Sequence, residues 1–192
     1  MKAISKLFMW AMMLMATTMT MVALTSCSDD DPDTETLPAE TKAQMYGRYN
    51  GFTYWGGGLT ASVTDVWVSE DHITYTLPMD LILPYVMTAE EGLTEALETV
   101  KADKAEASYT LVRYYNDVAS FTIPTQTVKF TYTVAGAKKS GTVKLTTQSY
   151  AYNASTKKLN VAYTIDAVTL GGKEISGLKK KVVRMADSTR KD

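Results

Sequence analysis

Alternation of apolar and polar residues with a period of two runs through most of this chain, and it limits the fold more than any other feature. In residues 127–134, Val128, Phe130 and Tyr132 share one face, and lysine and threonine occupy the other. Residues 159–167 repeat the pattern. One apolar and one polar face is typical of strands in antiparallel sheets. The sequence therefore predicts a mainly β domain.

Turn signals separate the alternating runs. Asn116-Asp117 and Gly171-Gly172 are two-residue hairpin signals, and residues 153–156 form a longer polar break. The spacing predicts roughly eight to ten antiparallel strands. It leaves open whether they close into a single β-barrel or stack as a β-sandwich. Further strands are expected at residues 47–54, 59–68, 73–77, 109–115, 118–123 and 178–185.

The alternation also predicts where individual side chains point. Tyr150 and Tyr152 are out of phase with Val143 and Leu145 along the same run. In an unbroken strand, side chains an odd number of residues apart lie on opposite faces. We therefore expect these tyrosines on the outer face, either exposed as a stripe or covered.

One segment has helical rather than strand periodicity. Thr88 and Glu91 match a capping box, in which each residue bonds to the backbone N–H of the other. Apolar residues then recur at helical spacing at Leu93, Ala96, Leu97 and Val100. We expect one amphipathic helix over residues 89–104. It would cover an open edge of the sheet or serve as a lid over a cavity.

The N-terminal region resembles the leader of a bacterial lipoprotein. Lys2 and Lys6 precede a long apolar run, which ends in the tetrapeptide Leu24-Thr25-Ser26-Cys27. An aliphatic residue and two small ones before a cysteine form a lipobox. The resemblance implies that residues 1–26 are a signal peptide and that Cys27, the only cysteine, carries the lipid that anchors the chain to a membrane. The alternative is an uncleaved membrane-spanning helix.

An acidic segment follows the lipobox. We expect residues 27–41 to form a disordered tether. The segment contains Asp29, Asp30 and Asp31, and like charges and proline keep such segments extended. The segment resembles the export signal of Bacteroidetes surface lipoproteins, which implies an outer-membrane protein at the cell surface. Residues 42–192 then form a single domain with a short polar C-terminal tail.

The start of that domain carries a second resemblance. Residues 46–51 read Tyr-Gly-Arg-Tyr-Asn-Gly, similar to the Gly-x-Tyr-x-Gly start of lipocalin-like domains in small uncharacterised Bacteroides lipoproteins. In those domains a first strand opens a meander that curls into a barrel. No catalytic residues are implied by this resemblance.

Charge and composition exclude several functions. After removal of residues 1–26, 18 basic residues face 21 acidic ones, so nucleic-acid binding is disfavoured. His72 is the only histidine and no Gly-x-Ser-x-Gly motif exists, which disfavours a hydrolase triad or a zinc site. The sequence favours a non-enzymatic protein without metal or cofactor.

Aromatic residues in the first part of the domain are the best candidates for ligand binding. Tyr54, Trp55 and Trp67 are selected because Tyr54-Trp55 leads directly into three glycines. A flat ring beside such a loop suits the apolar face of a sugar or a lipid. The alternative is that these rings only fill the core.

Three functions follow in order of preference. The first is a surface-tethered, non-enzymatic binding module for a glycan or other extracellular ligand. The second is a periplasm-facing, lipocalin-like carrier of an apolar small molecule, and the third is a structural component of a surface complex with an unidentified protein partner.

Two short motifs lie near the C-terminus. Asp187-Ser188-Thr189 resembles the O-glycosylation site of exported Bacteroides proteins, which makes Ser188 a candidate glycosylation residue in the expected polar tail. Residues 179–181 are three lysines that form a basic patch with Arg184, which would protect an edge strand from pairing with other chains or bind an anionic partner.

Overall fold

The computed structural model describes residues 36–55, 61–175 and 181–191. Outside this part of the chain lie the predicted signal peptide, Cys27, the glycines at 56–58, and Lys179 and Lys180. Only the backbone of Lys181 is described. Within the described residues, none of the helices has the length and apolar character needed to cross a bilayer.

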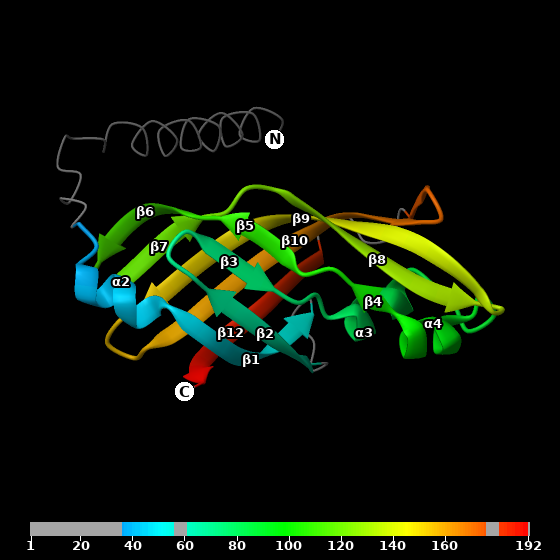
Figure 1. The fold of residues 1–192 in the computed structure, drawn as a ribbon, viewed down its shortest axis with the longest axis horizontal. Helices are drawn as coiled ribbons and strands as arrows, with labels where there is room; N and C mark the ends of the chain where they lie inside the picture. The colour runs from blue at the N-terminus through cyan, green and yellow to red at the C-terminus, as the bar shows by residue number, and fades with distance from the viewer. Residues whose placement is uncertain (1–35, 56–60, 176–180, 192) are drawn as a thin grey trace, which may run out of the picture. The chain divides into compact units, whose positions relative to one another are not determined.

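The described residues form a mainly β domain, as predicted, in which every strand pairing is antiparallel (Figure 1). Twelve strands belong to one sheet. They are β1 (Gly47–Trp55), β2 (Ala61–Val68), β3 (His72–Tyr75), β4 (Lys101–Ala102), β5 (Ala105–Ser108), β6 (Thr110–Tyr115), β7 (Val118–Thr122), β8 (Gln126–Val134), β9 (Ala137–Asn153), β10 (Lys158–Leu170), β11 (Lys173–Ile175) and β12 (Lys181–Lys191). The helical elements are α2 (Ala39–Met45), α3 (Met79–Ile82), the 3-10 turn η1 (Leu83–Tyr85) and α4 (Leu93–Thr99).

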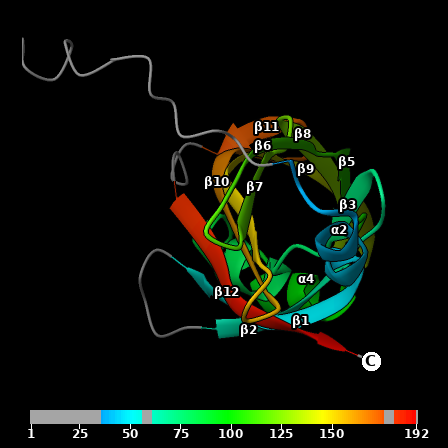
Figure 2. The ribbon, with the colours of Figure 1, turned by 90° about the vertical axis from the view of Figure 1, so that its left-hand side faces the viewer.

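Within the described residues, the two ends of this sheet are joined by the chain and not by a strand pairing. In one direction from β12 the neighbours are β1, β2, β3 and β5. In the other they are β10 and β9, and β9 pairs with β8 over one part of its length and with β7 over another, with β4 beyond β8 and β6 beyond β7. Only Tyr109 separates β5 from β6, so the two series end in one stretch of chain. Figure 2 shows the strands curling around a common interior. The described strands thus form one curled sheet rather than two stacked sheets.

Tyr109 lies at the junction between β5 and β6. Its hydroxyl donates to the carbonyl oxygens of Ser69 and Glu70, at 2.7 and 3.0 Å. Its ring meets Phe121 and Tyr150 edge to face, with centroids 5.1 and 5.5 Å apart. The Tyr109 side chain therefore connects the β2–β3 turn to β7 and β9.

The hairpin predictions are confirmed. Asn116 and Asp117 both have positive φ between Tyr115 and Val118, which are paired. Gly171 and Gly172 also have positive φ, in the turn between β10 and β11. Two consecutive positive φ values suit the right-handed twist of the flanking strands, and Asn, Asp and Gly tolerate them best.

The prediction that Tyr150 and Tyr152 lie on the outer face of the sheet is wrong. Both are buried on the same side as Val143 and Leu145. The cause is a bulge in β9: Ala162 and Tyr163 pair with Ser149 and Thr147, so residue 148 is extra. One extra residue reverses the alternation beyond it.

The predicted helix over residues 89–104 is present but much shorter. Of the two predicted capping contacts one forms, in which the Glu91 carboxylate accepts from the Thr88 backbone N–H at 2.7 Å, while the Thr88 hydroxyl donates to the same carboxylate. However, Gly92 has a φ of +87°, which ends the capping turn, and α4 begins only after it. At the other end Lys101 pairs with β8 as part of β4. A sheet partner therefore replaces the last turns of the expected helix.

The helix α2 lies partly inside the expected tether, so the folded domain begins before residue 42. Its Thr41 and Met45 are buried. The Tyr49 hydroxyl donates to the Met45 carbonyl oxygen at 2.7 Å, and Tyr152 and Arg190 donate to that of Gln44. These donors satisfy carbonyls that the end of a helix leaves without partners.

The interior of the curled sheet is filled by large side chains. The biggest of the almost fully buried ones are Tyr49, Tyr75, Tyr150, Tyr152 and Phe130. Tyr75 and Tyr163 lie with centroids 5.5 Å apart, and burial raises the pKa of both hydroxyls far above the ordinary value. The helical segment α3–η1, which the sequence reading missed, adds further buried residues at Met79, Leu81, Ile82 and Leu83.

Candidate functional site

The two faces of β1 and β2 separate the aromatic residues that the sequence groups together. Tyr49 faces inward and is fully buried. Phe52, Tyr54 and Trp67 face outward and are 58, 39 and 56 % exposed. Of the predicted binding residues, Tyr54 and Trp67 thus lie on the surface, and the side chain of Trp55 lies outside the described part of the structure.

The strand register places a polar group between the exposed rings. Trp67 lies opposite Arg48 and Phe52 lies opposite Val63, with the pair Asn50 and Asp65 between them. Tyr54 and Trp67 therefore stand toward opposite ends of this face and do not form one contiguous aromatic platform.

Asp65 is the centre of that polar group. Its two carboxylate oxygens accept hydrogen bonds from the Arg48 guanidinium and the Asn50 amide. The hydrogen bond from Arg48 is the main reason that the pKa of Asp65 lies below its usual value. The pair is ionised at neutral pH and holds its side chains in place beside Trp67.

A small cleft adjoins Trp67. It has a volume of about 270 Å³ and is lined by Arg48, Asp65, Val66, Trp67, Thr74, Tyr75, Thr76 and Lys104. The cleft presents hydroxyl, carboxylate and cationic groups beside one exposed indole. This combination can hydrogen-bond a polyol while a ring stacks on its apolar face.

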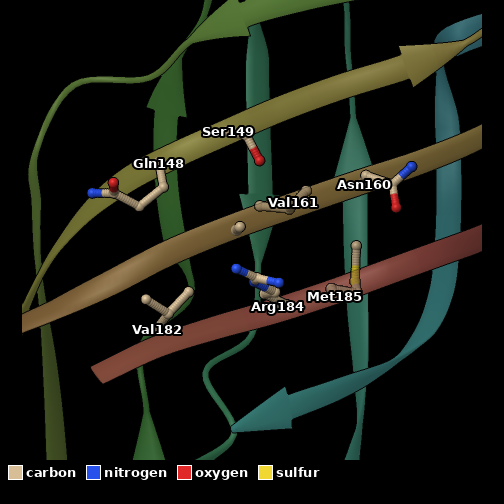
Figure 3. Close-up of a pocket in the computed structure, with 8 residues that line it drawn as sticks. Gln148, Ser149, Asn160, Val161, Val182, Arg184 and Met185 are labelled. Carbon is tan, nitrogen blue, oxygen red and sulfur yellow. The ribbon is translucent and has the colours of Figure 1, made fainter. Parts of the chain in front are cut away.

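A second hollow lies across β9, β10 and β12 on the outer surface (Figure 3). It has a volume of about 350 Å³, within the range of small-molecule sites. The lining residues are Gln148, Ser149, Asn160, Val161, Ala162, Val182, Arg184 and Met185. The β9 bulge leaves both Gln148 and Ser149 exposed, and the short side chains of Ser149 and Ala162 leave room above the sheet.

The register joins this hollow to the exposed rings of β1. Ser149 pairs with Ala162, Ala162 pairs with Arg184, and Arg184 pairs with Tyr54. These four residues thus form one row across four adjacent strands, about 14 Å long at the usual strand spacing. Tyr54 and the hollow are parts of one surface with Arg184 between them.

The sequence did not lead us to select Phe52 as a binding residue, although it has the same phase as Tyr54 in an alternating strand. Arg184 was expected only as part of the basic patch with residues 179–181. Its place beside Tyr54 could not be predicted, because only the pairing of β12 with β1 brings the two together. More than 120 residues separate the two along the chain.

The expected polar tail around Ser188 is wrong. Residues 181–191 form β12, which pairs with both β1 and β10. Ser188 is completely buried at the bulge of this strand, against Gly51. In the folded domain its hydroxyl is therefore out of reach of a glycosyltransferase.

The residues considered for catalysis or metal binding are not brought together into a site in the described part of the chain. His72 lies in the β2–β3 region and forms an ion pair with its neighbour Asp71 at 2.8 Å, which raises the pKa of His72. Among the described residues, no group of three or more His, Cys, Asp or Glu is placed to hold a metal ion. Comparisons with protein-family profiles, curated proteins and solved structures gave no match.

Proposed function

We propose that this protein is a non-enzymatic, glycan-binding lipoprotein displayed at the cell surface. The observation that supports this is the outer face of β1 and β2, where Phe52, Tyr54 and Trp67 are exposed among hydrogen-bonding side chains. Exposed rings beside ordered polar groups are a common arrangement at ligand-binding surfaces. The polar Arg48–Asp65–Asn50 group would bind sugar hydroxyls, and the rings would cover apolar sugar faces.

The buried aromatic residues favour surface binding over the carrier alternative. An internal carrier needs space for its cargo inside the curled sheet. Here the inward positions of the strands are occupied by bulky side chains such as Tyr49, Tyr150 and Tyr163. The apolar groups that remain accessible to a partner lie on the outside.

Affinity electrophoresis and calorimetry on a polysaccharide panel test the binding proposal. The mature chain from Cys27 would be compared with Tyr54→Ala, Phe52→Ala and Trp67→Ala. Loss of a stacked ring should weaken binding about five- to tenfold for each residue, on the scale of single aromatic contacts. Tyr115→Ala is the matched control, because Tyr115 is also an exposed tyrosine but lies on β6.

Two outcomes would contradict the proposal. One is that no polysaccharide in the panel is retained by the wild-type chain. The other is that Tyr115→Ala weakens binding as much as the three β1–β2 variants, which would remove the assignment to this face.

The anchoring part of the proposal has its own test. Cys27→Ala should release the protein from the membrane fraction, because a stable anchor requires the lipid chains. Protease added to intact cells should remove the signal of an antibody against the folded domain. Protection until the outer membrane is broken would instead place the domain in the periplasm.

A further inference from the structure

Arg184 is an exposed cation at the centre of the outer face. It lies on β12 between Ala162 of β10 and Tyr54 of β1. Among the described residues it forms no ion pair and no hydrogen bond, whereas Arg48 on the same face is bonded to Asp65. Its guanidinium is thus an exposed cation to which no described side chain is bonded.

The hollow beside Arg184 is lined by polar side chains and by the apolar Val161, Ala162, Val182 and Met185. Figure 3 shows side chains from three adjacent strands around it, with Arg184 at its middle and the amides of Gln148 and Asn160 toward its ends. Ser149 adds a hydroxyl group. Apart from Arg184, none of the residues that line the hollow is charged.

One guanidinium among uncharged amide and hydroxyl groups indicates which class of sugar would suit the hollow. A guanidinium presents a planar fork of N–H donors that matches the two oxygens of a carboxylate. In a uronic acid the carboxylate is attached directly to the sugar ring, so one residue brings both groups to the site together. Amides and hydroxyls suit the remaining ring hydroxyls.

We propose that the hollow binds a uronic acid residue of an acidic polysaccharide, with its carboxylate on Arg184. This rests on the proposed glycan-binding function and specifies its ligand. The row from Ser149 to Tyr54 has room for more than one sugar ring. The residue in the hollow is held by Arg184, Gln148 and Asn160, and the next residue of the chain lies over Tyr54.

The test compares each acidic polymer with a neutral copy of itself. Polygalacturonate, alginate and hyaluronan would be titrated against the mature protein together with their methyl-esterified forms. Esterification keeps the sugar and its linkage and removes the charge. A charge-assisted hydrogen-bond pair should make at least one acidic polymer bind about 10- to 100-fold more tightly than its ester.

Variants assign that preference to Arg184. Arg184→Gln should abolish the difference between acid and ester. Arg184→Lys should recover only part of it, because an ammonium lacks the planar fork. Arg113→Gln is the matched control, since Arg113 is also an exposed arginine but lies on β6 over the Tyr115 ring and does not line the hollow. Tyr54→Ala should weaken the acid and the ester alike.

The outcomes separate this inference from the proposed function. Equal binding of acid and ester, with loss of both in Tyr54→Ala, would overturn the uronate assignment and leave glycan binding intact. Displacement by dextran sulfate as effective as by a uronate polymer would also overturn it, as a general attraction for anions. No binding of any polymer or ester would overturn both.

Discussion

The inner and outer faces of β1 carry similar aromatic side chains with opposite roles. Tyr49 packs edge to face with Tyr152, at 6.5 Å between centroids, and has no exposed surface. Tyr54, five residues further along, stands at the surface beside Arg184. An odd separation in a strand is enough to put two residues on opposite faces. Aromatic content alone therefore cannot distinguish a core from a binding surface, whereas the phase of the strand can.

A second contrast lies within the core itself. The Tyr49 hydroxyl has a partner, the Met45 carbonyl oxygen at 2.7 Å. The Tyr163 hydroxyl is equally buried, and no described residue accepts or donates a hydrogen bond to it. Two tyrosines of the same interior thus differ in what their hydroxyl groups contribute, and substitution can measure the difference.

The largest expected effect tests inner against outer positions. Tyr163→Ala should lower the free energy of unfolding by about 3–5 kcal/mol, because it removes a fully buried ring and leaves a cavity. Tyr54→Ala should change it by less than about 0.5 kcal/mol, as for other surface substitutions. Urea unfolding followed by tyrosine and tryptophan fluorescence measures both. Similar losses in the two variants would show that the face assignment is wrong.

The next effect concerns the contact between β1 and the β12 bulge. A Cβ atom at Gly51 would overlap the Ser188 side chain and approach Met185 Cγ at 3.1 Å. Gly51→Ala should therefore destabilise the domain by about 1–3 kcal/mol through overpacking.

A double-mutant cycle with Ser188→Gly checks the cause of that loss. Once the Ser188 side chain is removed, Gly51→Ala should cost clearly less, so the two changes should not add. If the cost of Gly51→Ala stays the same in the Ser188→Gly background, the close approach of these residues is not its origin.

A smaller effect separates the two buried hydroxyls. Tyr49→Phe should cost about 1 kcal/mol, because it removes the hydrogen bond to the Met45 carbonyl oxygen. Tyr163→Phe should be neutral or stabilising, because it removes a buried polar group that has no partner among the described residues. Thermal and urea unfolding of the two variants give the comparison. A larger loss for Tyr163→Phe than for Tyr49→Phe would reverse it.

The smallest effect is the pH dependence of the outer polar group. Because the pKa of Asp65 is lower in the folded chain than in the unfolded one, its pairing with Arg48 stabilises the fold above a pH of about 4. That contribution should be lost as the pH falls through the folded-state pKa. It should be below about 1 kcal/mol, since both side chains are substantially exposed.

Asp65→Asn provides the control for this titration. The difference in stability between wild type and variant should be present at pH 6 and shrink toward pH 3. A difference that stays constant over this range would mean that the charge of Asp65 does not stabilise the fold.

Local patterns explain the parts that could be predicted. The structure contains the alternation in residues 159–167, the turns at Asn116-Asp117 and Gly171-Gly172, and the contact between the Thr88 backbone N–H and the Glu91 carboxylate. Each depends on residues close together in the chain, whose steric preferences act before any long-range contact forms. The exposed positions of Tyr54 and Trp67 follow from the same alternation once one buried neighbour is known.

The predictions that were wrong needed contacts between distant segments. The bulge at residue 148 reversed the phase of Tyr150 and Tyr152, and nothing in the local sequence marks it. The strand expected to end at residue 185 continues to residue 191 as part of β12, which pairs with β1 and β10, and this buries Ser188 in place of the expected tail. Likewise, pairing of Lys101 with β8 shortened the expected helix.

The sequence by itself determined that this chain forms antiparallel strands, where most of them begin and end, and which residues turn the chain between them. It did so because side-chain alternation and turn preferences act over a few residues. Only the tertiary structure decided that Tyr109 bonds to the β2–β3 turn and that Arg184 lies beside Tyr54. Both depend on hydrogen bonds between segments far apart in the chain, and their register is set by the combined burial of all strands.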